Sequence, residues 1–95
     1  MKTAFEGNRI MENEIYTMNH YGKIKCTLRQ FLEARNMSRN KLARLVGTRF
    51  EVIDRWYKGD VEKIDTDVLA RICFVLSCDP SDIITYVPKE EAGRD

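Results

Sequence analysis

The side chains that usually carry out enzyme chemistry are few in this sequence, and they do not form a familiar set. The single histidine, His20, has no serine and aspartate partners at a catalytic spacing, and the sequence contains no glycine-rich phosphate loop. Asp65 and Asp67 form the clearest carboxylate pair, but they stand where a helix is expected to begin, and the helix dipole favours acidic residues there. We therefore expect a protein that is not an enzyme.

The cysteines give no sign of a metal site or a disulfide framework. Cys26, Cys73 and Cys78 are odd in number and contain no Cys-x-x-Cys pair. A zinc site would need further ligands, and the one histidine is far along the chain from any cysteine cluster. We expect three reduced, buried thiols in a cytoplasmic protein, with no metal and no cofactor.

Basic side chains, in contrast, gather in one part of the chain. The 95 residues include 16 Lys and Arg against 15 Asp and Glu, so the net charge is only +1. Residues 23–63, however, contain eleven basic and five acidic residues, so this segment carries +6 and the remainder carries −5. Contact with a phosphate backbone requires a basic face of this kind, which favours a nucleic-acid partner.

The composition indicates one small folded domain that would position these charges. Hydrophobic residues make up 43% of the chain and charged residues 33%, which is typical of a single compact core. We expect residues 1–22 to be a poorly ordered extension, 23–88 to form the domain and 89–95 to be a polar tail. The sequence has no run of 18 apolar residues, so neither a spanning helix nor a membrane partner is expected.

Apolar periodicity and capping residues predict five helices. They are expected at 28–35, from Ser38 to Gly47, from Thr48 through Tyr57, from Asp65 or Thr66 through an apolar stripe to Leu76, and briefly after Asp79. Ser38 and Asp79 are suitable N-caps, and Gly47 and Gly59 are suitable helix ends.

Two further local patterns accompany these helices. Thr27 and Thr48 each have a Gln or Glu three positions later, Gln30 and Glu51, which predicts two capping boxes. The segments 24–26 and 84–87 are expected to be short and extended, and they could pair with each other or across a two-fold axis.

The spacing within residues 39–58 is more specific than the number of helices. Counting Arg39 as the first position, a small residue comes fifth, a glycine ninth, and apolar residues fourth, fifteenth and eighteenth: Ala43, Gly47, Leu42, Ile53 and Trp56. The small residue lets two helices cross closely, the glycine permits a left-handed turn, and the apolar residues hold the pair on the core. This arrangement is a helix-turn-helix.

From about Ile24 to Pro88 the chain resembles the Cro/C1-type, or XRE-type, helix-turn-helix domain of bacterial and phage regulators. The residues that carry the resemblance are 37–43, Gly47, 53–59, 64–73 and 78–83. The resemblance implies an all-α, compact five-helix domain like that of lambda repressor, which the two extended segments would supplement with a short two-stranded element. It is more specific for fold than for function, because the matches lie at core and turn positions.

The same resemblance implies sequence-specific binding of double-stranded DNA by a transcriptional regulator, as a homodimer, with residues 49–58 in the major groove. By position, the base-contacting residues would be Arg49, Phe50, Glu51 and Arg55. Arginine can bond to guanine, glutamate can accept from cytosine N4, and phenylalanine can pack on a thymine methyl. The phosphate-contacting residues would be Arg39, Lys41, Lys58 and Lys63.

A second interpretation fits some of these residues. The family more often has Ser, Gln, Asn or Thr at the base-facing positions, whereas Phe50 is large and apolar and Glu51 is an anion. The chain could instead be a protein-interaction module on the same fold, such as an antitoxin or adaptor, gripping a protein partner through an exposed patch of Phe50, Trp56 and Tyr57. Core and core-edge positions are nevertheless the simpler expectation for Trp56 and Tyr57.

Several charged residues also have simpler interpretations. Glu51 could merely complete its capping box. Arg29, Arg35 and Arg71 could be solvated surface charges. Asp54 is a second anion, beside Glu51, in the helix expected to face DNA, and the sequence leaves open whether these two anions weaken DNA binding.

Overall fold

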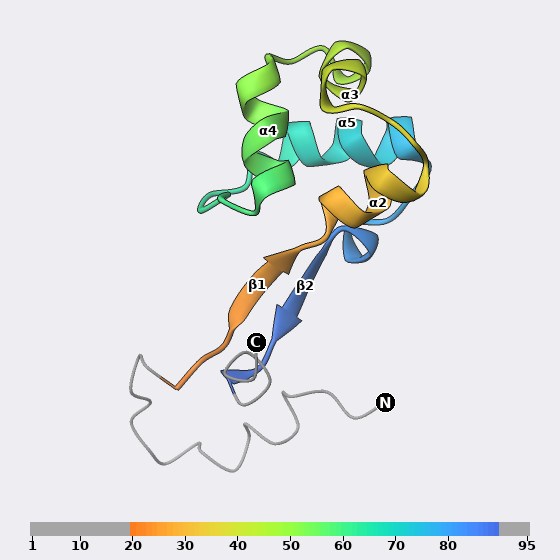
Figure 1. The fold of residues 1–95 in the computed structure, drawn as a ribbon. Coiled ribbons are helices and arrows are strands. Elements are labelled where there is room, and N and C mark those ends of the chain that lie inside the picture. The colour runs from red at the N-terminus through yellow and green to blue at the C-terminus, as the bar shows by residue number, and fades with distance from the viewer. Residues whose placement is uncertain (1–19, 90–95) are drawn as a thin grey trace. The chain divides into compact units, whose positions relative to one another are not determined.

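The computed structural model describes residues 20–89, so the extension expected at 1–22 and the tail expected at 89–95 lie almost entirely outside the described residues. The elements in chain order are β1 (Lys23–Cys26), α2 (Leu28–Ala34), α3 (Arg39–Val46), α4 (Phe50–Lys58), α5 (Thr66–Leu76), the short 3₁₀ helix η2 (Pro80–Asp82) and β2 (Ile84–Val87) (Figure 1).

The prediction of five helices is wrong, because the brief fifth helix expected after Asp79 is not an α-helix. The described residues contain four α-helices, and the segment after Asp79 forms only the three-residue η2. Asp79 and Asp82 form a capping box there, in which the Asp79 N–H donates to Asp82 Oδ2 at 2.8 Å. The β-branched residues that follow from Ile83 favour extended backbone, so the chain leaves the turn directly for β2. The fold is therefore mostly helical with a two-stranded sheet, rather than all-α with five helices.

The described residues fall into two units. Ile24–Thr85 is one compact unit and holds all the helices, while 20–23 and 86–89 belong to the other. β1 and β2 pair as a two-stranded sheet, and their arrows run in opposite directions (Figure 1). At the end of the sheet next to α2, the Thr27 N–H donates to the Ile83 carbonyl at 2.8 Å. The two extended segments predicted from the sequence therefore pair within one chain.

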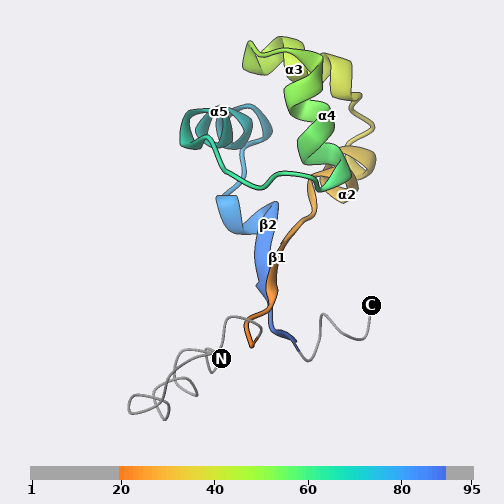
Figure 2. The ribbon, with the colours of Figure 1, turned by 90° about the vertical axis from the view of Figure 1, so that its left-hand side faces the viewer.

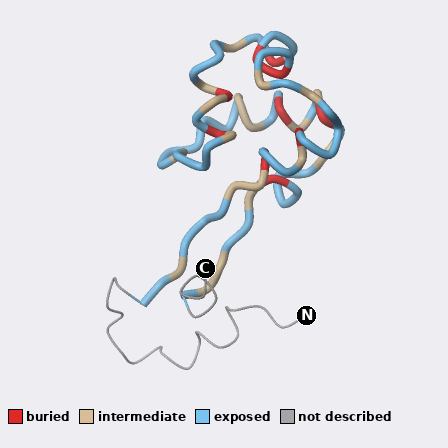
Figure 3. The backbone as a smooth tube through the Cα atoms, viewed as in Figure 1, coloured by how far each residue is buried: buried red, intermediate tan, exposed pale blue. Residues whose placement is uncertain are grey.

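The core lies inside the helical unit (Figure 3). Every α-helix contributes buried apolar side chains, and one more follows η2: Leu28, Leu32, Leu42, Ala43, Val46, Ile53, Trp56, Ile72, Leu76 and Ile83. Full burial of an aliphatic side chain of this size stabilises a fold by about 2 kcal/mol. The expected core role of Trp56 is confirmed, since only 4% of it is exposed.

The predicted helix-turn-helix is α3, a tight turn and α4, which cross each other (Figures 1 and 2). Ser38 caps α3 as expected, because its Oγ accepts the Lys41 N–H at 3.0 Å. Gly47 ends α3 in the left-handed conformation, with φ +80°, and donates its N–H to the Ala43 carbonyl at 2.9 Å. Ala43 itself is buried between the helices, as the small residue at the fifth position predicted.

Both capping boxes predicted at threonines are wrong. Thr27 precedes α2 but makes no cap, because its Oγ1 donates instead to the Asp82 carbonyl at 3.0 Å. The N-cap of α4 is Arg49 rather than Thr48, and no side chain caps that helix end. Glu51 therefore lies in the first turn of α4, where the helix dipole favours its charge. The helix expected to begin at Asp65 or Thr66 begins at Thr66, and the Asp65 side chain caps it.

Two arginines expected to be solvated charges instead hold helix ends. The Arg71 Nη1 donates to the Val46 carbonyl at 3.2 Å, joining α5 to the end of α3. Arg35 donates to the Leu76 carbonyl at the end of α5. Both satisfy carbonyls that a helix terminus leaves without intrahelical partners.

Candidate nucleic-acid interface

The helix α4 has one buried and one exposed face. Ile53 and Trp56 point into the core, and the helical period places residues 51, 55 and 58 on another side. Glu51, Arg55 and Lys58 are all exposed there. The solvent side of α4 therefore carries charged groups that can form hydrogen bonds with a ligand.

All four predicted base-contacting residues belong to α4 or its N-cap. Arg49 is the N-cap, Phe50 and Glu51 are the first two helical residues, and Arg55 follows one turn later. All four are exposed, and 37% of Phe50 is accessible to solvent. The structure thus brings this set together at the N-terminal half of one helix.

The predicted phosphate-contacting residues separate into two groups. Arg39 begins α3 and Lys58 ends α4, and their side chains meet at the same carboxylate, that of Asp54. Lys41 is exposed on α3 and Lys63 is exposed in the loop before α5, and neither of these lysines forms an ion pair with a described residue.

Asp54 is the centre of an ion-pair network that we call the Asp54 cluster: Asp54, Arg39 and Lys58. Arg39 Nη1 lies 2.6 Å from Oδ1, and Lys58 Nζ lies 3.0 Å from Oδ2. The Asp54 side chain is 19% exposed, against 39% for Arg39 and 59% for Lys58. The hydrogen bond from Lys58, followed by that from Arg39, holds the pKa of Asp54 below its ordinary value. The carboxylate is therefore charged at neutral pH, and the cluster has a net charge of +1.

Aromatic rings restrict Arg39 further. Its guanidinium carbon lies 4.5 Å from the centre of the Tyr57 ring and 5.6 Å from that of Phe50. Cation–π contacts of this kind favour a fixed position of the guanidinium. Phe50 thus packs partly on its own domain, and Tyr57 is half-buried at the core edge as predicted.

A groove of about 580 Å³ opens beside the Asp54 cluster. It is lined by three cations from three helices, an aromatic ring and small or polar groups: Arg29, Arg39, Lys58, Tyr57, Gln30, Cys26 and Gly59. Arg29 is held over the Tyr57 ring at 5.8 Å and is paired with Glu33 at 3.2 Å. The groove has the charge and the donors to accept an anion.

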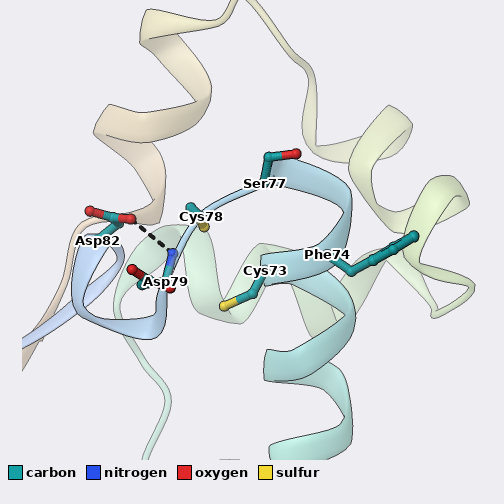
Figure 4. A pocket seen from close by; sticks show the side chains of 6 residues that line it. All are labelled: Cys73, Phe74, Ser77, Cys78, Asp79 and Asp82. Atoms are coloured by element: carbon teal, nitrogen blue, oxygen red, sulfur yellow. Dashed lines mark hydrogen bonds between the residues drawn. The ribbon is translucent and has the colours of Figure 1, made fainter.

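A smaller hollow of about 360 Å³ lies at the C-terminal end of α5 (Figure 4). Cys73, Cys78 and Phe74 are among the residues that line it, and the Phe74 side chain is 85% exposed. The three cysteines are free, as expected, although they are half-buried rather than buried. Desolvation, followed by its interaction with Cys73, raises the pKa of the Cys78 thiol to about 11. Across residues 20–89, no three His, Cys, Asp or Glu side chains are grouped as a metal site would require.

The exposed aromatic patch that a protein-interaction module would use is not formed. Of the three residues that would form it, Trp56 is buried in the core, Tyr57 is covered in part by Arg39, and Phe50 alone is exposed. In the described part of the chain, no helix has the length and apolar character needed to cross a membrane.

Sequence reasoning missed the role of Asp54 and the position of Arg29 in the groove. The spacing of Asp54 and Lys58, four residues apart on one helix, was a usable signal for that pair. Arg39 lies 15 residues before Asp54, and only the crossing of α3 and α4 brings them together.

Comparisons with known proteins agree with this geometry. The chain is similar to a solved transcriptional regulator, VanUg, with 26% identity and a TM-score of 0.60, over 80% of this chain and 100% of that one. It also shares its fold with a protein from Bacteroides fragilis thought to bind DNA, with 21% identity and a TM-score of 0.58, over 66% of this chain and 100% of that one. No curated protein matches this sequence. The model of one family, however, matches residues 27–89, and this protein belongs to that family, the Cro/C1-type helix-turn-helix DNA-binding domains.

Proposed function

We propose that this protein is a transcriptional regulator that binds particular sequences of double-stranded DNA as a homodimer, with residues 49–58 in the major groove. The observation that carries the proposal is the solvent side of α4. Its first turns expose Arg49, Glu51 and Arg55, and the cations Arg39 and Lys58 lie close by. Base readout requires side chains with donors and acceptors on an accessible helix, and positioning requires cations beside them.

Each exposed residue at the start of α4 has a role in this proposal. Arg49 and Arg55 would donate to guanine, and Glu51 would accept from cytosine N4. Phe50, which packs on Arg39 but keeps part of its ring exposed, would contact a thymine methyl. Lys41 and Lys63, both exposed, would join Arg39 and Lys58 in contacting phosphates.

The proposal also includes a regulatory role and a homodimer. The similarity to the transcriptional regulator VanUg favours a regulatory, non-enzymatic role, and the proposal places this role in the cytoplasm. A homodimer would present two copies of α4 to half-sites about 34 Å apart, one helical turn of DNA.

Selection from a random duplex library at moderate salt tests the proposal. We expect an enriched sequence with two-fold symmetry, whose affinity for the protein falls steeply as salt is raised. A library without enrichment, together with binding that does not depend on salt, would refute the proposed function. Enrichment of an asymmetric single site would refute only the homodimer.

A further inference from the structure

We propose that Asp54 is a specificity-determining residue: it acts as an internal counter-ion that competes with DNA phosphates for Arg39 and Lys58. The inference rests on the proposed function, because it concerns how the protein distinguishes its preferred sequence from other DNA. The geometry that carries it is the Asp54 cluster, in which one carboxylate occupies both cations, at 2.6 and 3.0 Å.

The cluster changes what the two cations offer to a phosphate. Arg39 and Lys58 are 39% and 59% exposed, so a phosphate can reach both, whereas Asp54, at 19%, stays behind them. A phosphate that takes either cation must displace the carboxylate or share the cation with it. The carboxylate therefore lowers the electrostatic affinity that the protein shows toward every DNA sequence.

The same carboxylate also positions Arg39. The guanidinium is held by Asp54 on one side and by the rings of Tyr57 and Phe50 on others. A guanidinium fixed in this way suits one phosphate position relative to α4, which is the position available when α4 is correctly seated in the groove. Phosphate contacts set the register of the protein on the duplex, so a fixed Arg39 favours the preferred sequence.

Asp54→Asn separates these effects, because the amide keeps the size and a hydrogen-bonding oxygen but removes the charge. Binding is measured on an arbitrary 20-base-pair duplex and on the duplex selected from the random library, over a series of salt concentrations. On the arbitrary duplex, the slope of log affinity against log salt should become steeper by about 0.9, the value for one added phosphate contact. At about 0.1 M salt this corresponds to a gain in affinity of up to roughly eightfold.

The selected duplex should gain less affinity than the arbitrary duplex, since Arg39 loses its fixed position, and the ratio between the two affinities should fall. Asp67→Asn is the matched control. It removes the same charge from an ion pair of 3.0 Å, with Arg71 on α5, outside the Asp54 cluster. This control should change neither the slope nor the ratio.

The possible results are distinguishable. If wild type binds both duplexes and Asp54→Asn leaves the slope and the ratio unchanged, or lowers both affinities equally, Asp54 is only structural and the inference is wrong. If wild type shows no salt-dependent binding at all, the proposed function fails and the inference fails with it. Circular dichroism melting checks that the variant is folded, and Asp54→Ser takes its place if it is not.

Discussion

Arg55 offers the sharpest test of base readout, because its side chain makes no contact that would stabilise the described part of the fold. It is exposed on α4, and no described residue forms a hydrogen bond or ion pair with its guanidinium. Arg55→Ala should therefore leave the free energy of unfolding within about 0.5 kcal/mol of wild type, as for most surface substitutions. A lost bidentate contact to guanine costs about 1–3 kcal/mol.

These energies convert to a weakening of roughly 5- to 150-fold on the selected duplex. The loss should be much smaller on a duplex in which the contacted base pair is changed, because the contact is absent there already. Titration of both duplexes by fluorescence anisotropy, with melting followed by circular dichroism, measures the effect.

Arg44→Ala is the matched control for Arg55→Ala, since it removes another exposed arginine side chain, from the last turn of α3. It should affect both duplexes equally and weakly. Equal losses on all sequences with a shallower salt slope would make Arg55 a phosphate contact. Unchanged binding in Arg55→Ala would remove it from the interface, and either result would refute the assignment of Arg55 to base contact.

Three further predictions concern the scaffold and its surroundings. Gly47→Ala and Gly59→Ala should each destabilise the fold by about 1–2 kcal/mol in thermal melting, because both residues have positive φ (+80° and +79°). An added methyl would meet no side chain closer than 3.6 Å, so the cost comes from the backbone conformation and not from a clash. A loss of stability at only one of the two glycines would contradict this explanation. Lys41→Ala should weaken binding to all duplexes evenly and make the salt slope shallower by about 0.9 in the same titrations, whereas a change of preferred sequence would contradict this role. The pKa of Cys78 is raised from 9.0 to about 11, so the stability that its thiol contributes is full below pH 9 and is lost as pH rises toward 11. The rate of its alkylation by iodoacetamide should be slow at pH 8 and increase between pH 9 and 11. Rapid labelling of Cys78 in the folded protein at pH 8 would contradict the shift.

The helix-turn-helix was predictable from sequence because its determinants are local. Gly47 and Gly59 act through their own backbone, and Ser38 acts through a side-chain hydrogen bond to Lys41, three positions on. Ala43 and Trp56 act through spacings set by the helical period. The four exposed base-contacting candidates could also be placed together in advance, since they lie within two turns of one helix.

Three of the errors in prediction arose where a tertiary contact replaced a local one. Thr27 had the right neighbour for a capping box, but the Asp82 carbonyl, 55 residues away, takes its hydroxyl. Arg35 and Arg71 look like surface charges until the carbonyls at the ends of α5 and α3 appear beside them. A residue with both a local and a distant partner cannot be assigned from spacing alone, because their relative energies depend on the fold.

The same reasoning separates Glu51 and Asp54, two of the five anions of the basic segment, which looked equivalent in the sequence. Asp54 is mostly shielded from solvent and is balanced by two cations. Glu51 is exposed in the first turn of α4 and has no ion-pair partner among the described residues. In a major groove, the Glu51 carboxylate would therefore be repelled by the phosphates of any DNA sequence. A hydrogen bond from a cytosine amino group would offset this repulsion, and only where that base is present. On the proposed function, Glu51 weakens binding to wrong bases, while Asp54 limits binding to the backbone, so the two anions limit non-specific affinity by different routes.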